Sequence, residues 1–464
     1  MTFGVFAPCF KPSQRRDSCC ALCQLCDPLT LFSIYTTSTM ASPVFKIIPT
    51  TQKYDWGKIG TSSKVAQFAE ASRIPGFTLD KQAPYAELWM GTHPSSPSRL
   101  LSDVNTTLAS HLAAHPELIG ENVRARFVDA GAEEGNLPFL FKVLAIEKAL
   151  SIQTHPDKAM AEILHRERPD VYKDANHKPE MALALTPFTA LCGFLPLPQI
   201  AAYLTSIPEF AALLPETIVA KFLSISDSVN PTGPAEKAAL KDLFAAVMTA
   251  EEALFKDQLS KLVQRYELGP KSDAEQPVKE LVLRLHSQFP GDIGVFCAFI
   301  LNYVSMNPGE AIFLAAGEPH AYVSGDIIEC MATSDNVIRA GLTPKLRDVP
   351  NLVSGLTYQA ADASKHLVKP SQRWPHTHLY DPPIPEFSVL GLSLSAGESE
   401  SHDAIDGPSI VIVTEGHGKV VWGDEKLEVQ VGDVFFVGAG TPVQFQASED
   451  GVALFRAFVE VEVK

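Results

Sequence analysis

The stretch GEAIFLAAGEP, residues 309–319, recurs later in the chain as GDVFFVGAGTP, residues 432–442. Both copies share the order glycine, acid, a phenylalanine in a short apolar run, then alanine, glycine and proline. Glycine turns on either side of a short apolar strand are typical of a small double-stranded β-barrel, or jelly roll. Two copies therefore predict two such barrels, with a chance likeness between two β-hairpins as the alternative.

The residue that follows each copy differs. His320 follows the first copy and Val443 follows the second. If the motif positions a metal ligand, the first barrel has the ligand and the second barrel has lost it.

The segments around these copies differ in their apolar periodicity. VFKIIPT (44–50) and FLFKVLAIEKALSIQTH (139–155) are predicted to form strands. Between residues 198 and 290 the apolar residues instead follow helical spacing, as in Val278, Leu281, Val282 and Leu285. We therefore predict a mainly β protein into which an α-helical domain is inserted.

Composition limits the class of protein. The chain has 464 residues, 46% of them apolar, which excludes general disorder. The net charge of −16 disfavours nucleic acid and anionic membranes as partners. No run of apolar residues is long enough to span a bilayer, and we expect no membrane segment. An anionic substrate would need a local basic pocket.

The cysteines are unevenly distributed. Five of the eight lie near the N-terminus, at Cys9, Cys19, Cys20, Cys23 and Cys26. The other three, Cys192, Cys297 and Cys330, are far apart, which predicts reduced, buried thiols in a cytoplasmic protein. CCALCQLC resembles half of a zinc knuckle, but no second Cys/His pair follows at finger spacing. We expect residues 1–39 to be a disordered or non-native leader, with Met40 as the functional start.

Three short motifs carry metal-ligating side chains. In SIQTHPDK (151–158), Gln153 and His155 share one strand face, and Pro156 would end that strand. HKPE contributes His177, Lys178 and Glu180, and GEPHAY contributes His320 and Tyr322. Two imidazoles, one carboxylate and one amide oxygen suit Zn²⁺ with an open position for water or substrate. Each motif taken singly is more typical of a structural role.

The remaining histidines are weaker candidates. His93 is expected in a loop, and four others are expected to face solvent: His115, His165, His286 and His402.

A fourth stretch, SDNVIRAGLTPKLRDV (334–349), concentrates charge. It carries Asp335, Arg339, Lys345 and Arg347 in an otherwise acidic protein. Such a Gly/Pro-containing segment is usually a solvated loop. A phosphorylated substrate, however, would need this kind of basic patch.

These motifs resemble those of the type I mannose-6-phosphate isomerase (phosphomannose isomerase) family. The likeness covers YDWG (54–57), ELWMGTHP (87–94), FLFKVL (139–144), ALSIQTHPDK (149–158), HKPEMA (177–182) and GEPHAYVSGDIIECMATSDNVIRAGLTPK (317–345). It spans most of residues 44–464 in the family's order, and residues 1–39 fall outside it.

The resemblance implies two cupin-like jelly-roll β domains plus a helical domain. The expected division is a catalytic β domain in two parts (40–196 and 291–365), a helical domain (197–290) and a C-terminal cupin-like β domain without a metal site (366–464).

The resemblance also implies the site residues. It implies one Zn²⁺ per chain, with Gln153, His155, Glu180 and His320 as ligands and His177 only as a neighbour. The implied catalytic residues are Arg339, Lys178, Asp335 and Lys345. The implied substrate-binding residues are Trp56, Lys142, Ser151 and Tyr322.

The implied reaction interconverts D-mannose 6-phosphate and D-fructose 6-phosphate through a cis-enediol, supplying mannose for GDP-mannose synthesis and glycosylation. Lys178 and the pair Asp335 and Lys345 are alternative carriers of the proton. A cytoplasmic monomer is expected, whose partner is a small sugar phosphate. Two other classes stay open: a cupin oxygenase that uses Fe(II), and a non-catalytic cupin that binds sugar phosphates.

Overall fold

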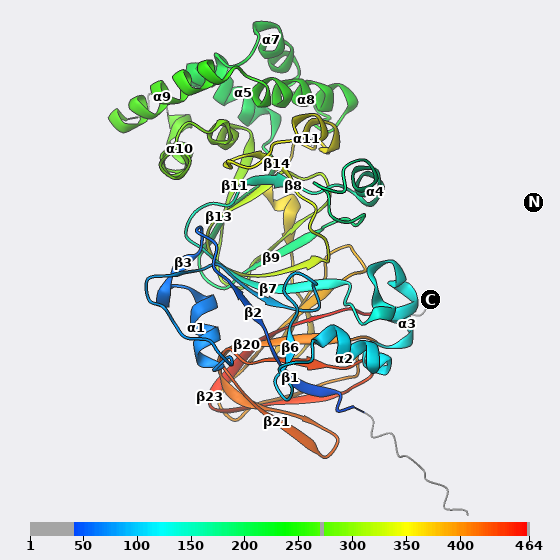
Figure 1. Ribbon diagram of the computed structural model, residues 1–464. Coiled ribbons are helices and arrows are strands. Elements are labelled where there is room, and N and C mark those ends of the chain that lie inside the picture. The colour runs from blue at the N-terminus through cyan, green and yellow to red at the C-terminus, as the bar shows by residue number, and fades with distance from the viewer. Residues whose placement is uncertain (1–40, 270–272, 462–464) are drawn as a thin grey trace, which may run out of the picture. The chain divides into compact units, whose positions relative to one another are not determined.

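The computed structural model describes residues 41–269 and 273–461, and those from Ser42 onward belong to one compact unit (Figure 1). The expected leader, residues 1–39, and the expected functional start, Met40, lie outside the described residues. The predicted fold class is confirmed, since two large antiparallel sheets account for most of this unit and a group of helices is inserted between strands of the first sheet.

The first sheet has 11 strands, in the order β15-β12-β9-β13-β7-β5-β2 with β8, β10, β11 and β14 attached. Their bounds are β2 (Thr50–Gln52), β5 (Glu87–Met90), β7 (Phe139–Ile146), β8 (Ile152–Thr154), β9 (Glu180–Ala184), β10 (Phe188–Phe194), β11 (Leu301–Met306), β12 (Ala311–Leu314), β13 (His320–Ala332), β14 (Ile338–Gly341) and β15 (Leu367–Val368). The long strand β13 pairs with β8 and β10 at its start and with β7 and β9 along the rest of its length, and it thereby joins both halves of this first barrel.

The second sheet has 10 strands, in the order β16-β17-β18-β23-β20-β22-β1-β6 with β19 and β21 attached. Their bounds are β1 (Val44–Ile48), β6 (Arg99–Leu100), β16 (Ser371–Trp374), β17 (Thr377–Tyr380), β18 (Ser388–Leu394), β19 (Ser399–His402), β20 (Ser409–Trp422), β21 (Glu425–Gln430), β22 (Val434–Val437) and β23 (Val443–Phe458). A two-stranded ribbon of β3 (Lys58–Ile59) and β4 (Pro84–Tyr85) lies apart from both sheets.

Two strands, β1 and β6, join a sheet that their place in the chain does not suggest. β1 falls within the range expected for the first β domain, yet it pairs with β22 in the second sheet, Val44 opposite Val437. The ring of Phe45 stacks on Phe436 with 5.2 Å between centroids. An apolar strand pattern does not state which sheet will receive the strand, because both sheets offer a similar apolar surface.

The repeated motif has the same structure in both barrels. The first copy forms β12 and turns at Gly317 into β13, which begins at His320. The second copy forms β22 and turns at Gly440 into β23, which begins at Val443. Gly317 and Gly440 have φ of +74° and +71°, the left-handed region that glycine adopts without strain. The predicted equivalence of the two copies is confirmed.

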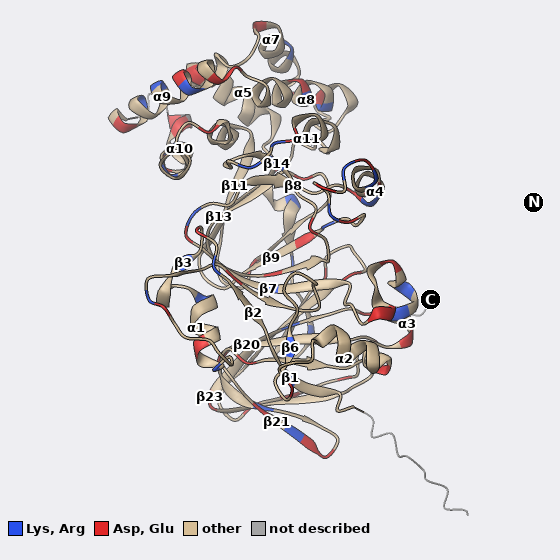
Figure 2. Ribbon diagram, viewed as in Figure 1, with Lys and Arg blue, Asp and Glu red and all other residues tan. Residues whose placement is uncertain are grey.

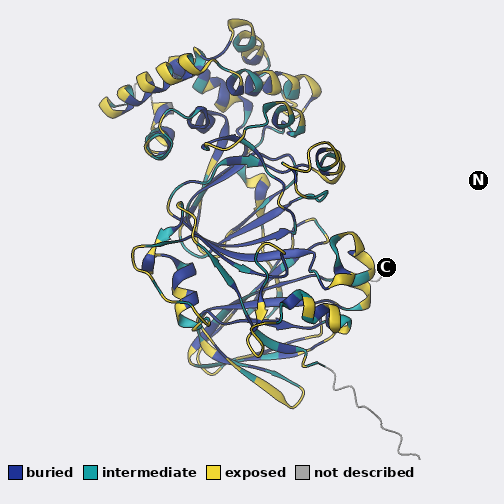
Figure 3. Cartoon of the chain, in the orientation of Figure 1, coloured by how far each residue is buried: buried dark blue, intermediate teal, exposed yellow. Residues whose placement is uncertain are grey.

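The helices between β10 and β11 form the inserted helical region. They are α5 (Leu197–Ser206), α6 (Pro208–Ala211), α7 (Glu216–Ile225), α8 (Pro234–Met248), α9 (Glu252–Leu268) and α10 (Gln276–Gln288). The predicted apolar face of α10 is buried, from Val278 to Leu285. Figure 3 shows buried strands in both sheets and exposed outer faces on these helices.

The other helices are α1 (Lys64–Ala71), α2 (Leu108–Ala114), α3 (Glu121–Arg126), α4 (Lys158–Glu167) and α11 (Val349–Gly355). Figure 2 shows acidic and basic residues mixed along exposed helices such as α9. Among the described residues, no helix combines the length and the apolar character that crossing a bilayer requires.

Two expectations about single side chains have opposite outcomes. Cys192, Cys297 and Cys330 are free and buried, as predicted. His402, which was expected to face solvent, is only 1% exposed and lies inside the second barrel. The prediction was wrong because SESH, residues 399–402, forms β19, whose alternate side chains point into the barrel.

Candidate active site

Four strands of the first barrel, β8, β13 and β14 side by side and β9 with Glu180 at its start, bring the predicted ligands and Arg339 together. β8 lies between β13 and β14, and Gln153 at its centre is paired with His320 on one side and Arg339 on the other. β8 ends at Thr154, just before His155 and Pro156. Proline has no amide hydrogen for a sheet, which explains why the strand stops there.

His155, Glu180 and His320 form a buried group, with one candidate ligand atom from each within 4.8 Å of the others. Nε2 of His155 lies 3.3 Å from Oε1 of Glu180, and Nε2 of His320 lies 3.3 Å from Oε2. Nδ1 of His155 is 2.6 Å from the carbonyl oxygen of Asn336, and Nδ1 of His320 is 3.0 Å from that of Glu318. A carbonyl oxygen only accepts, and each Nδ1 must therefore donate. The lone pairs of both Nε2 atoms are left facing Glu180.

This donor set fits a metal ion. Among the described residues, Nε2 of His155 and Nε2 of His320 are buried without a hydrogen-bond partner. Burial lowers the pKa of His155 to about 4, which keeps its ring neutral near pH 7. Burial alone would raise the pKa of Glu180, but Lys178 and His155 bring it well below its ordinary value. Two imidazoles and one carboxylate suit Zn²⁺.

Two predicted residues contact the carboxylate of Glu180. Nζ of Lys178 lies 3.1 Å from Oε1, and the hydroxyl of Tyr322 donates to Oε2 at 3.4 Å. Burial is the main cause that raises the pKa of Tyr322, and its hydroxyl stays protonated. His177 points elsewhere, with Nε2 2.6 Å from Oε1 of Glu386.

Lys142 lies in a buried ion cluster. Its ammonium is 3.1 Å from Glu329, 3.5 Å from Glu87 and 4.8 Å from the centroid of the Trp89 ring. Burial would lower the pKa of Lys142, but the carboxylates of Glu329 and Glu87 raise it above its ordinary value. The lysine therefore stays charged. Burial raises the pKa of Glu329, although the positive charge of Lys142 acts in the opposite direction.

Sequence reasoning missed Glu329 and Glu87. Glu329 interrupts the apolar run of β13, and an acid in a buried strand needs a partner, which was the available signal.

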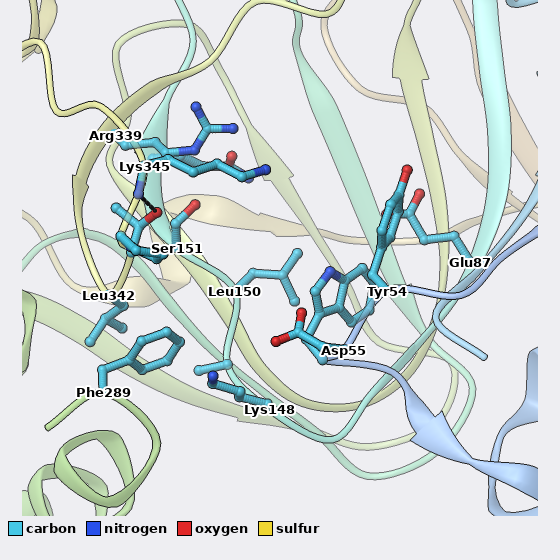
Figure 4. A pocket seen from close by; sticks show the side chains of 15 residues that line it. Tyr54, Asp55, Glu87, Lys148, Leu150, Ser151, Phe289, Arg339, Leu342 and Lys345 are labelled. Atoms are coloured by element: carbon cyan, nitrogen blue, oxygen red, sulfur yellow. Dashed lines mark hydrogen bonds between the residues drawn. The ribbon is translucent and has the colours of Figure 1, made fainter. Parts of the chain in front are cut away.

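A cavity of about 400 Å³ reaches Gln153, the strand partner of His320, while His155, Glu180 and His320 themselves do not line it. Five predicted residues line it, namely Trp56, Ser151, Gln153, Arg339 and Lys345. Figure 4 shows Arg339 and Lys345 side by side near Ser151, with Tyr54, Asp55 and Glu87 across the cavity. Lys148 and Phe289 also line it, and sequence reasoning missed both.

Arg339 and Asp335 lie on the same segment but have different surroundings. Burial lowers the pKa of Arg339, and the described residues offer its guanidinium no hydrogen bond or ion pair. Asp335 is close to His93, with Oδ1 3.4 Å from Nε2, and this contact is the main cause that lowers the pKa of Asp335. His93 lies in the loop after β5, as expected, and is buried there. Asp335 also lines a smaller cavity of about 150 Å³ on the other side of Arg339.

Fold and site together define a cupin-like enzyme with a buried His–Glu–His group and a basic cavity beside it. Family models give the particular family. The model described as phosphomannose isomerase type I, catalytic domain, matches residues 44–197. The helical insertion domain of that family matches residues 216–301, and its C-terminal domain matches residues 378–425.

Known proteins agree with these matches. Mannose-6-phosphate isomerase from Cryptococcus neoformans var. neoformans is 51% identical over 91% of this chain and 100% of its own length. The protein of that name from Saccharomyces cerevisiae is 43% identical over the same shares of the two chains. A structure of mannose 6-phosphate isomerase from Salmonella typhimurium, bound to fructose 6-phosphate and zinc, has a TM-score of 0.75 and 30% identity over 90% of this chain and 100% of that one.

The chain belongs to the type I phosphomannose isomerase family, and it is an isomerase. The family resemblance read from its motifs is confirmed.

Proposed function

We propose that this chain interconverts D-mannose 6-phosphate and D-fructose 6-phosphate through a cis-enediol, with one Zn²⁺ held by Gln153, His155, Glu180 and His320. The observation that carries the proposal is the buried His–Glu–His group, with two unpartnered Nε2 atoms, beside a cavity that contains Arg339 and Lys345. The relatives' names and the zinc- and sugar-bound neighbour support the same reaction.

When bound, Zn²⁺ supplies Lewis-acid polarisation of the sugar's carbonyl oxygen. Glu180 contributes the only negative charge among the four proposed ligands, because Gln153 offers a neutral amide oxygen. A second carboxylate in place of Gln153 would reduce the positive charge available at the reacting oxygens.

Arg339 is the proposed stabiliser of the negative charge that develops on the enediolate. The described residues offer its guanidinium no carboxylate, and its hydrogen-bond donors remain available to substrate oxygens. Donors that are already oriented toward such a charge usually contribute the largest single part of catalysis. Lys345, Ser151 and Trp56 line the same cavity and are proposed to hold the sugar phosphate.

The proton carrier has two candidates. Lys178 is buried 3.1 Å from Glu180, next to the proposed metal site. Asp335 together with Lys345 is the alternative, on the Arg339 segment. Exchange of the C2 hydrogen with solvent distinguishes them: Lys178→Met is expected to abolish the exchange if Lys178 carries the proton. Exchange at the wild-type rate would assign the proton to the other pair.

Lys142 and Tyr322 have a proposed role behind the cavity. Lys142 contacts Glu329 and Glu87, and Tyr322 contacts Glu180. The resemblance implies that both bind substrate, but neither lines the cavity, and we propose that they act on substrate through these carboxylates, of which Glu87 lines the cavity.

The finer parts of the function are also proposals. We propose that the enzyme is a cytoplasmic monomer that supplies mannose for GDP-mannose synthesis, without nucleic acid or membrane as a partner. We further propose the division into a catalytic domain (40–196 and 291–365), a helical domain (197–290) and a C-terminal domain (366–464), with β1 and β6 contributed to the C-terminal sheet.

The decisive experiment is a coupled assay of fructose 6-phosphate formation from mannose 6-phosphate, with chelator and with zinc restored. We expect turnover that disappears with chelator and returns with Zn²⁺. Stoichiometric iron with oxygen consumption would instead favour a cupin oxygenase. Binding without turnover would favour a non-catalytic sugar-phosphate protein.

A further inference from the structure

The segment 334–345 carries Arg339 and Lys345, yet the side chain of Arg339 has no hydrogen bond or ion pair with the described residues. Its place is set by its backbone, which pairs with Gln153. β14 has only four residues, Ile338–Gly341, and a strand this short needs support at its ends. The two groups that bind these ends are therefore decisive for where the guanidinium lies.

Asp292 binds the C-terminal end of the segment. It lies after α10, at the start of the 3-10 helix Ile293–Phe299. Its Oδ1 accepts from the amides of Gly294 and Leu342, at 2.7 and 2.8 Å, and its Oδ2 accepts from the amide of Thr343 at 3.1 Å.

The backbone at this contact is strained and tightly packed. Leu342 has φ of +54°, which side-chain-bearing residues rarely adopt. A Cβ added to Gly341 would lie 2.5 Å from Cα of Gly294. A strained turn persists only when its surroundings impose it, and the carboxylate of Asp292 is the group that binds both of its amides.

Asp174 binds the N-terminal end of the segment. Its Oδ1 accepts from the hydroxyl of Ser334 at 2.8 Å and from the side-chain amide of Asn336 at 3.1 Å. Its Oδ2 accepts from the amide of Asp335 at 2.8 Å. The backbone carbonyl of the same Asn336 accepts a hydrogen bond from Nδ1 of His155. This end of the segment therefore also orients a proposed metal ligand.

We propose that Asp174 and Asp292 are positioning residues that hold the two ends of segment 334–345 and thereby set the places of Arg339 and Lys345. The proposal rests on the proposed role of Arg339. Asp292 acts on the wall of the cavity that contains Leu342, Thr343 and Lys345 (Figure 4). Asp174 holds the end of the segment that contacts His155, through Asn336.

The test uses the full chain with bound zinc and the variants Asp292→Asn and Asp174→Asn, which keep the side-chain shape but turn one acceptor into a donor. We expect Asp292→Asn to raise KM and lower kcat, each by about tenfold, with unchanged zinc content. We expect Asp174→Asn to lower kcat and to weaken zinc retention against a competing chelator, each by roughly tenfold. Asp433→Asn is the matched control, because Asp433 is a buried carboxylate that accepts a backbone amide in the second barrel, and its kinetic constants should stay at wild type.

A double-mutant cycle separates positioning from simple stabilisation. In an Arg339→Ala background, Asp292→Asn should no longer lower kcat, since the group that it positions is gone. A merely structural Asp292 would lower Tm in both backgrounds and leave the kinetic constants of the folded enzyme unchanged, which would overturn the proposal.

Two further outcomes are distinct. If Arg339→Ala itself turns over at the wild-type rate, the proposed role of Arg339 fails and the positioning proposal with it. If Arg339→Ala is slow while both aspartate variants are normal, only the positioning proposal fails.

A measurement on the wild-type enzyme covers the case in which the variants do not fold. Amide hydrogen exchange should be much slower at Leu342 and Thr343 than at exposed Leu346. Equal exchange rates at the three amides would overturn the proposal.

Discussion

The two barrels contain the same β-strand motif, but they differ in the contacts of the histidine beside it. In the first barrel His320 follows the motif and pairs with Gln153 across the strands. In the second barrel Val443 follows the motif and pairs with His402. Each barrel therefore has one imidazole at this paired position, but on opposite strands.

The surroundings of the two imidazoles differ more than their positions. Nε2 of His320 lies buried with no hydrogen-bond partner among the described residues, facing Glu180. His402 stacks on Trp374, 4.0 Å between centroids, and its Nε2 is 3.0 Å from the hydroxyl of Thr377 and 3.3 Å from Glu400. In the first barrel two unpartnered Nε2 atoms face one carboxylate, whereas in the second barrel Nε2 of His402 is hydrogen-bonded and only its Nδ1 lacks a partner among the described residues.

This difference shows that a shared barrel is not a shared site. A metal site needs several unpaired polar atoms directed at one point, whereas a core satisfies most of its buried polar atoms and leaves at most isolated ones unpaired. Four substitutions test this contrast, beginning with the largest expected effect on turnover.

His320→Val gives the first barrel the residue that the second barrel has after the motif, Val443. We expect bound zinc to fall to near zero and turnover to fall by roughly a thousandfold or more, because a Lewis acid supplies several kcal/mol of transition-state stabilisation. Metal analysis and the coupled assay measure both. The reverse change, Val443→His, should add no second zinc, since Nε2 of His402, the strand partner of residue 443, and the carboxylate of Glu400 are already hydrogen-bonded to Thr377. A fully active, zinc-loaded His320→Val would contradict the proposed ligand set.

Arg339→Ala removes the unpaired guanidinium of the first barrel. We expect kcat to fall by about 10²–10³ with zinc content unchanged, since one charge-stabilising donor group is typically of this importance. Arg456→Met is the control from the second barrel, where Arg456 is fully buried and donates to Ser409. That variant should lower Tm without changing kcat. Equal losses of kcat in both variants would show that Arg339 acts through stability.

Gln153→Glu adds a negative charge beside the metal group. We expect zinc to be retained and turnover to fall by roughly ten- to a hundredfold, because a second carboxylate weakens the Lewis acid. Steady-state kinetics with zinc analysis are the measurement. Gln444→Glu, on β23 of the second barrel, should leave both unchanged. Full turnover in Gln153→Glu would refute the charge argument.

His402→Phe keeps a ring on Trp374 and removes a titrating group. Burial, with the nearby Arg456 and Arg373, lowers the pKa of His402 to about 3, against about 6.5 in the unfolded chain. As pH drops below 6.5, His402 is protonated in the unfolded chain while it stays neutral in the folded chain. The free energy of unfolding therefore falls between pH 6.5 and 3, by up to about 1.4 kcal/mol per pH unit.

We expect His402→Phe to lose part of this acid sensitivity in denaturation curves between pH 7 and pH 4, with normal turnover at pH 7. His417→Phe, a half-exposed site in the same barrel, should keep the wild-type slope. A wild-type slope in His402→Phe would contradict the burial argument.

Much of the fold was predictable from local patterns. The strands near residues 44 and 139, the helical spacing of Val278 to Leu285 and the repeated turn motif depend on neighbours in sequence. The pairing of β1 with β22 was not predictable, because either sheet edge offers amides and carbonyls to an apolar strand. His402 was misjudged because burial of a polar residue depends on partners distant in sequence, here Trp374 and Thr377.

The candidate site divides in the same way. The motifs around Gln153, Glu180, His320 and Arg339 were recognisable as donors at plausible spacing, and the family resemblance joined them. Glu329 and Glu87 were missed because each is notable only for its contact with Lys142 on another strand. His93 was ranked as a weak candidate because its contact with Asp335 joins two loops distant in sequence.

The sequence by itself determined the class of fold, the repeat and the set of side chains able to bind a metal and a sugar phosphate. These follow from period, turn residues and donor chemistry, which are local properties of the chain. Only the tertiary structure decided which donors keep free lone pairs and which are satisfied internally. That choice depends on contacts between strands distant in sequence: the carbonyls that hold Nδ1 of His155 and His320, and the two aspartates that hold the ends of the Arg339 segment.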